Sequence, residues 1–129
     1  MIDHIGLDVS DIEKSRSFYA RALEPLGYRI VQEVRPEPAG APTVVMFGVG
    51  EDPDFVIARD QTPGPGNHVA FRADTRDQVD AFHAAGLAAG GTAIEDPPGP
   101  RNASEGRVLY LAYLRDPAGN KVCALHRIK

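Results

Sequence analysis

The stretches IDHIGLDVSDIEKSRSFYARALEPLGY, residues 2–28, and GNHVAFRADTRDQVDAFHAAGLAAGGT, residues 66–92, decide the fold because they repeat one pattern. The aligned identities are His4 with His68, Phe18 with Phe82, Ala20 with Ala84, Leu23 with Leu87 and Gly27 with Gly91. Each copy has a short apolar strand followed by a segment of helical periodicity. The sequence therefore predicts two related modules.

Both predicted helices carry start and stop signals. Residues 10–13 fit the S-x-x-E capping box with Ser10 as its first residue, and residues 75–78 fit T-x-x-Q. Gly27 and the glycine pair 90–91 follow the helices, where a left-handed cap is favoured. These signals place one helix after the first strand of each module.

Three further strands follow each helix, separated by segments rich in Pro, Gly and Asp. They are predicted near 28–34, 43–49 and 54–59 in the first module and near 91–95, 107–115 and 121–127 in the second. Residues 1–60 form module one, residues 66–129 form module two, and DQTPGPG at 60–66 links them. This is an α+β chain of two βαβββ modules, which we expect to pack into a single domain because each is too small alone.

Composition excludes several classes of partner. The chain has 129 residues, a net charge of −4 and no run of Lys or Arg, which disfavours nucleic acid and anionic membrane surfaces. Cys123 is the only cysteine, so no internal disulfide can form. We expect a cytoplasmic protein, because no signal peptide or membrane-spanning apolar run is evident.

His4 and His68 fall on corresponding faces of the two first strands. Strand alternation places them opposite the bulky apolar residues that should contact the helices. Two imidazoles that converge in a shared concave surface are a common start of a metal site. The alternative is a pair of structural histidines retained from a duplication.

The sequence resembles the vicinal oxygen chelate superfamily, which includes glyoxalase I, extradiol dioxygenases and bleomycin-resistance proteins. The two repeated stretches and LAYLRDPAGNKVCALH, residues 111–126, carry the resemblance, with a DP-x-GN turn before the last strand. It implies that the modules pair into a cupped mixed β-sheet with helices on the outer face. It also implies a homodimer and, in metal-dependent members, one divalent ion inside the cup.

The resemblance assigns His4 and His68 to the two first-strand metal ligands. It places Cys123 where metal-dependent members usually have glutamate. In the corresponding strand of module one it places Val56 or Ile57, neither of which can ligate, and Val56 would contact the substrate. Neither a site with two carboxylates nor a two-histidine, one-carboxylate triad is therefore present.

Cys123 has three possible roles. As a thiolate ligand it would complete a His₂Cys set that favours zinc. As a nucleophile or redox-active thiol it would need a lowered pKa. As a small buried side chain it would need neither.

Tyr113 and Arg101 are two further candidates. If the DP-x-GN turn closes a hairpin with Arg115 opposite Lys121, Tyr113 faces Cys123 and could move a proton; a one-residue slip would bring Tyr110 and Leu114 there. Arg101, in a predicted Gly/Pro-rich loop, could bind an anionic substrate or lie in solvent.

Two functions remain open. The first is a metal-dependent lyase, isomerase or dioxygenase that acts on a small oxygenated substrate, with Tyr113 and Cys123 as catalytic groups. The second is a small-molecule binding protein of the bleomycin-resistance type that uses no cofactor.

Overall fold

The computed structural model describes residues 1–59 and 62–128, so part of the predicted 60–66 linker, and the last residue assigned to each module, lie outside it. The strands are β1 (Ile5–Val9), β2 (Arg29–Val34), β3 (Val44–Gly48), β4 (Phe55–Arg59), β5 (His68–Arg72), β6 (Thr92–Ala93), β7 (Gly99–Asn102), β8 (Val108–Arg115) and β9 (Lys121–Arg127). The helices are α1 (Ile12–Ala22) and α2 (Arg76–Ala88), with short 3₁₀ turns η1 (Glu24–Leu26) and η2 (Ser104–Gly106).

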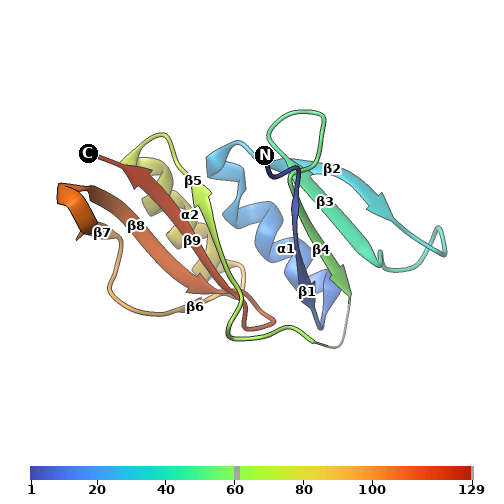
Figure 1. The fold of residues 1–129 in the computed structure, drawn as a ribbon. Helices are drawn as coiled ribbons and strands as arrows, with labels where there is room; N and C mark the ends of the chain where they lie inside the picture. Colours follow the sequence, from blue (N-terminus) through green and yellow to red (C-terminus); the bar gives the residue numbers. More distant parts are fainter. Residues whose placement is uncertain (60–61, 129) are drawn as a thin grey trace.

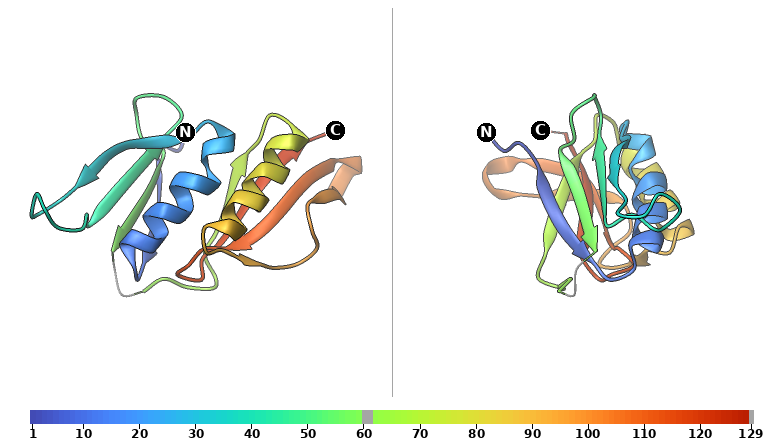
Figure 2. Two further views of the ribbon diagram at one scale, coloured as in Figure 1. Left: turned by 180° about the vertical axis from the view of Figure 1, so that it is seen from behind. Right: turned by 90° about the vertical axis from the view of Figure 1, so that its right-hand side faces the viewer.

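Each module forms its own mixed sheet, which confirms the α+β class and the βαβββ pattern. The first sheet has the order β1-β4-β3-β2, and the second has β5-β9-β8-β6 with β7 also paired to β8. In each sheet the first strand pairs in parallel with the last one, and the other pairs are antiparallel. The edge strands β1 and β5 lie side by side and run in opposite directions (Figure 1). Both helices cover the same side of the two sheets (Figure 2).

One strand was not predicted. The segment read as a Gly/Pro-rich loop contains β7, so Arg101 lies in a strand, where it pairs with Leu109 of β8. Pro100 weakens the strand signal in the sequence, but proline is tolerated here because β7 is an edge strand. The strand predicted near 91–95 is shorter than expected and consists of Thr92–Ala93 alone.

Each helix is preceded by a residue whose side chain accepts a hydrogen bond from a backbone N–H group of the first turn. Asp11, not Ser10, caps α1 by accepting a hydrogen bond of 3.1 Å from Lys14 N, so the predicted Ser10 cap is wrong by one residue. Thr75 caps α2 as predicted, accepting from Gln78 N at 3.1 Å. Within the described part of the chain, neither helix is long and apolar enough to cross a bilayer.

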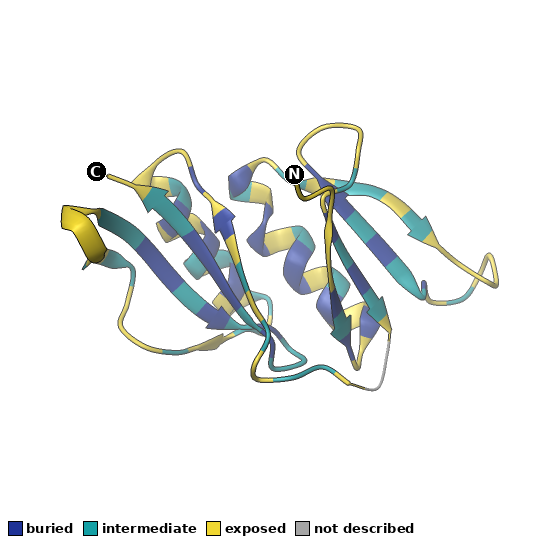
Figure 3. Cartoon of the chain, viewed as in Figure 1, coloured by how far each residue is buried: buried dark blue, intermediate teal, exposed yellow. Residues whose placement is uncertain are grey.

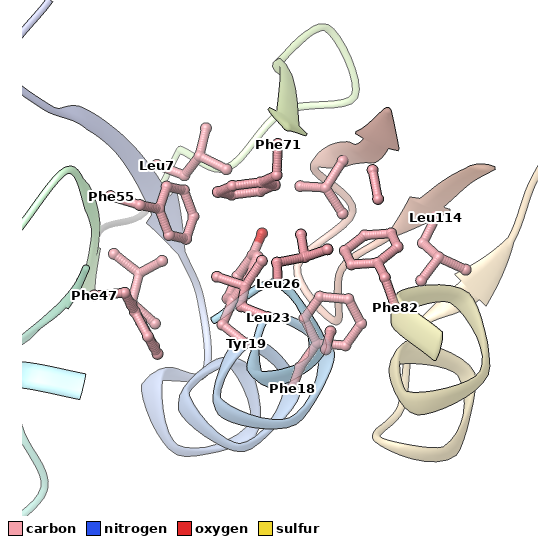
Figure 4. Packing of buried hydrophobic residues seen from close by; sticks show 14 of the residues in the cluster. Leu7, Phe18, Tyr19, Leu23, Leu26, Phe47, Phe55, Phe71, Phe82 and Leu114 are labelled. Atoms are coloured by element: carbon pink, nitrogen blue, oxygen red, sulfur yellow. The ribbon is translucent and has the colours of Figure 1, made fainter. Parts of the chain in front are cut away.

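A single hydrophobic core joins the modules. The helix-facing residues of both sheets and the inner faces of α1 and α2 are buried, while the outer helix faces are exposed (Figure 3). Figure 4 shows aromatic rings from both modules in this core, including Phe18 and Phe55 from the first and Phe71 and Phe82 from the second. Phe55 and Phe71 meet edge to face with centroids 4.9 Å apart. The two modules therefore share one core.

A buried polar network also connects the modules at the DP-x-GN turn. The Tyr19 hydroxyl of α1 donates to Asp116 Oδ2 at 2.5 Å, and Asn120 Nδ2 donates to the carbonyl of Asp8 in β1 at 2.9 Å. Asn120 Oδ1 accepts from Asn67 Nδ2 at 3.0 Å and from Gly64 N at 3.3 Å. Because Asp116 and Asn120 are buried, these hydrogen bonds replace those that the side chains lose to water on folding.

Candidate functional site

The face of the second sheet that points away from α2, here called the open face, carries most of the predicted site residues. Its members follow from the ladder pairing, because directly paired residues share a face. They are His68, Ala70 and Arg72 of β5, Lys121, Cys123, Leu125 and Arg127 of β9, Leu109, Leu111, Tyr113 and Arg115 of β8, and Gly99 and Arg101 of β7. Their partners on the opposite face pack on the helix and include Val122, Ala124 and Leu114.

Tyr113 and Cys123 lie opposite each other, which confirms the predicted register of the β8–β9 hairpin. Tyr110, the residue that a one-residue slip would have brought there, faces α2 instead and donates to Asp80 at 2.8 Å. The DPAGN turn holds this register because Asp116 N donates to the Asn120 carbonyl at 2.9 Å. The sequence predicted this pair on the condition that the turn aligns Arg115 with Lys121, and the structure shows that alignment in place of the one-residue slip.

Cys123 belongs to the open face by strand register, but the residue is fully buried. It donates a hydrogen bond of 3.4 Å to its neighbour's carbonyl, that of Ala124. Burial raises its pKa from 9.0 to about 12, because the thiolate would lose its hydration. The thiol is therefore protonated at neutral pH, whereas a thiolate ligand or nucleophile needs the opposite shift. Of the three roles, these surroundings favour the small buried side chain.

Charged and aromatic groups surround the Tyr113 ring. Lys121 Nζ lies 4.3 Å from the ring centroid, within the range of a cation–π interaction. The His68 ring lies 5.6 Å away, centroid to centroid, with the two planes tilted by 58°. Glu95 Oε2 forms a 2.5 Å ion pair with Lys121 Nζ. Burial and the neighbouring Cys123 raise the pKa of Tyr113, so its hydroxyl is a hydrogen-bond donor at neutral pH.

Arg101 is anchored by backbone carbonyls. Its guanidinium donates to the carbonyls of Asp96 at 3.2 Å, Pro97 at 2.9 Å and Pro100 at 3.3 Å. These acceptors carry no formal charge, and no carboxylate forms an ion pair with Arg101 among residues 1–59 and 62–128. The side chain is thus fixed in orientation while its positive charge stays available.

The open face is cationic although the whole chain has a net charge of −4. Its positive side chains are Arg72, Arg101, Arg115, Lys121 and Arg127, placed there by the pairing of β5, β9, β8 and β7. A shallow cavity of about 240 Å³ opens beside Arg72, Leu125 and Arg127. Such a concentration of one charge attracts ligands of the opposite sign.

His4 and His68 do not converge in this chain. His4 directly precedes β1 and His68 begins β5, and because these adjacent strands run in opposite directions, the two residues lie toward opposite ends of the boundary between the sheets (Figure 1). The exposed His4 ring instead contacts its neighbour Asp3 at 2.7 Å. Over the described ranges, no three His, Cys, Asp or Glu side chains are grouped to hold a metal ion. The predicted set of His4, His68 and Cys123 therefore does not fit a metal within one copy of this fold.

Val56 lies on the other sheet. It pairs with Gly6 of β1 and Met46 of β3, on the side of the first sheet that points away from α1. The side chain is half-buried and lies outside the cluster around Tyr113. Its predicted contact with a substrate stays a prediction.

Sequence reasoning missed Lys121 and Glu95. Lys121 was detectable, because strand alternation places it two residues before Cys123 on the same face. Glu95 was not, because its contact depends on the path of the chain between β6 and β7.

Comparisons with known proteins agree with this architecture. The model of the Glyoxalase/Bleomycin resistance protein/Dioxygenase superfamily matches residues 1–124. The crystal structure of a glyoxalase/bleomycin resistance protein from Albidiferax ferrireducens T118 is 42% identical, with a TM-score of 0.80 over 97% of this chain and 98% of that one.

Two more distant structures share the fold. One is a glyoxalase/bleomycin resistance protein/dioxygenase family enzyme from Burkholderia phytofirmans PsJN, at 20% identity and a TM-score of 0.65 over 97% of both chains. The other is lactoylglutathione lyase from Agrobacterium tumefaciens, at 19% identity and a TM-score of 0.62 over 98% of this chain and 92% of that one. No curated protein matches this chain. The family-model match over nearly the whole length, together with the paired βαβββ modules, places this chain in the Glyoxalase/Bleomycin resistance protein/Dioxygenase superfamily.

Proposed function

We propose that this protein binds a small molecule on the open face of its second sheet without a metal ion. The observation that carries the proposal is the pairing of Tyr113 with a buried, protonated Cys123. The resemblance to metal-dependent members of the superfamily led us to expect glutamate at the position of Cys123. A site built this way offers aromatic and cationic contacts in place of carboxylate ligands. The ligand would contact Tyr113, His68 and Lys121.

The composition of the open face supports binding in place of hydrolytic or redox chemistry. Aromatic rings supply flat contact area, and a few placed polar groups orient a ligand, which is typical of small-molecule sites. The Tyr113 hydroxyl donates hydrogen bonds at neutral pH because its pKa is raised. Burial raises the pKa of the Cys123 thiol, which is the opposite of the shift that an activated nucleophile needs.

A metal-dependent lyase or dioxygenase is the second candidate. The observation that favours it is the equivalence of His4 and His68, both exposed at the start of matched strands. Their positions at opposite ends of the boundary between the sheets count against it in a single copy of the chain. A third ligand would also have to replace the buried thiol.

Metal analysis and ligand screening together test the proposal. Protein purified without chelator or affinity tag is measured by elemental analysis and titrated with Zn²⁺ by calorimetry, beside the double variant His4→Ala, His68→Ala. A fragment library is then screened by amide NMR shifts, with and without EDTA. We expect no stoichiometric metal, and hits that shift resonances of β8 and β9. One metal per chain that is lost in the double variant would overturn the metal-free proposal, as would hits that disappear in EDTA.

The Tyr113→Leu variant localises the site. It keeps an apolar side chain of moderate size but removes the ring on which Lys121 rests, so we expect loss of the hits. Tyr28→Phe serves as the matched control, because Tyr28 lies outside the open face and donates to Asp54 at 3.2 Å. Equal loss in both variants would show that the hits bind elsewhere.

A further inference from the structure

The path of the chain between β6 and β7 carries a second inference, which rests on the proposed function. We infer that the ligand of the open face is a small carboxylate, whose anionic group takes the place of the Glu95 carboxylate on Lys121, above the Tyr113 ring. In the unliganded protein the Glu95 carboxylate would thus be an internal stand-in, occupying the position of the ligand's carboxylate. It keeps the cation neutralised until a carboxylate from solution replaces it.

The backbone at Glu95 has an unusual conformation. Glu95 has φ of 60°, in the left-handed region that a residue with a side chain rarely adopts. Such a conformation costs free energy, which the surroundings must offset. From this backbone position the Glu95 carboxylate forms its 2.5 Å ion pair with Lys121.

The Lys121 ammonium is already paired with a carboxylate. Within the part of the chain that the structure describes, Glu95 is its carboxylate partner, and its other close neighbour is the Tyr113 ring, 4.3 Å from Nζ to centroid. Tyr113 and Cys123 are both uncharged at neutral pH, because the pKa of each is raised. A ligand carboxylate on Lys121 would therefore compete with Glu95 for the same ammonium group.

The same segment also orients a second cation. Arg101 donates to the carbonyls of Asp96 and Pro97, the two residues that follow Glu95. These bonds use backbone acceptors and do not depend on the Glu95 side chain. When Glu95 leaves Lys121, Arg101 can remain in place and add to the positive potential that holds an anion.

The exchange predicts a distinctive effect of removing the Glu95 charge. Glu95→Gln keeps the size and the backbone substituent but no longer neutralises Lys121. Benzoate is the probe, and benzamide is its uncharged analogue of nearly the same shape. We expect Glu95→Gln to bind benzoate about threefold more tightly than the wild type, the order expected when a partly exposed ion pair no longer competes. Benzamide affinity should not change.

Asp96→Asn is the matched control. It removes the same charge from the next residue, whose carboxylate forms no ion pair among the described residues. If general charge repulsion governed benzoate binding, both variants would tighten it equally. Lys121→Met should weaken benzoate binding, and in its presence the Glu95→Gln substitution should no longer change benzoate affinity. Affinities and binding sites are both read from amide NMR titrations in EDTA.

Each outcome decides one point. Tighter benzoate binding in Glu95→Gln alone, with shifts at Tyr113 and Cys123, supports the inference. Benzoate affinity that is unchanged or weakened in Glu95→Gln overturns the stand-in role, and fragment hits on the open face would then still support the proposed function. Absence of benzoate binding in every variant overturns the carboxylate class, again without deciding whether uncharged fragments bind.

Discussion

The Tyr19 hydroxyl of α1 donates a 2.5 Å hydrogen bond to Asp116 Oδ2, in the turn between β8 and β9 of the other module. Both side chains are buried, and the aspartate also accepts from the backbone N–H groups of Ala118 and Asn120, each at 2.9 Å. Burial and the adjacent carboxylate raise the pKa of Tyr19, so the hydroxyl keeps its proton. Asp116 thus accepts hydrogen bonds both from its own turn and from helix α1 of the other module.

Loss of this contact should weaken the association of the modules. Tyr19→Phe removes the donor and leaves a buried carboxylate with one partner fewer, so we expect the free energy of unfolding to fall by about 2 kcal/mol. Tyr28→Phe removes a longer hydrogen bond, 3.2 Å to the exposed Asp54, and should cost about 0.5 kcal/mol. Urea denaturation of both variants measures the difference. Equal losses would mean that the buried contact contributes no more than the exposed one.

The cap of α1 gives a second prediction. Asp11→Ala should destabilise the protein by about 1 kcal/mol, because Asp11 holds Lys14 N at 3.1 Å. Ser10→Ala should change stability by less than about 0.3 kcal/mol, because another residue performs the capping. Thermal denaturation distinguishes the neighbours. The reverse order would restore Ser10 as the cap.

At Gly86 in α2, helix propensity favours alanine, but tight packing against neighbouring side chains opposes it. Alanine in the middle of a helix gains about 1 kcal/mol over glycine, but a Cβ at Gly86 would lie 2.3 Å from Leu114 Cδ1 and 3.3 Å from Phe18 Cε1. Because both neighbours are fully buried, we expect Gly86→Ala to be destabilising by about 1 to 2 kcal/mol.

A double-mutant cycle separates the two terms. In a Leu114→Ala background the clash is relieved, so Gly86→Ala should become neutral or stabilising. An identical effect in both backgrounds would rule out overpacking against Leu114.

Cys123 should make the protein sensitive to alkali. Its pKa is raised from 9.0 to about 12, so between these values the unfolded chain has released the thiol proton while the folded chain retains it. Stability is therefore fully present below pH 9 and is lost as the pH rises, by up to about 1.4 kcal/mol per pH unit.

Cys123→Ala removes this contribution. Urea denaturation at pH 7.5 and at pH 10 should show a smaller alkaline loss in the variant than in the wild type. Both proteins keep Tyr19 and Tyr28, whose raised pKa values contribute to the alkaline loss in each. Equal losses would contradict the buried, protonated state.

Local signals in the sequence determined the modules and most of their elements. The repeated stretches at 2–28 and 66–92 predicted each first strand and helix, because strand alternation and capping depend on neighbouring residues. The DPAGN turn predicted that Tyr113 faces Cys123, because a tight turn fixes the register of its own hairpin. The family followed from the same motifs.

Only the tertiary structure decided how the site is composed. The opposite directions of β1 and β5 separate His4 from His68 (Figure 1), although the sequence makes the two histidines equivalent. Strand β7 forms where the chain turns back along β8, and Glu95, in the segment before β7, meets Lys121 of β9. Such contacts depend on the relative placement of distant segments, which is set by the burial of a common core and not by the residues on either side.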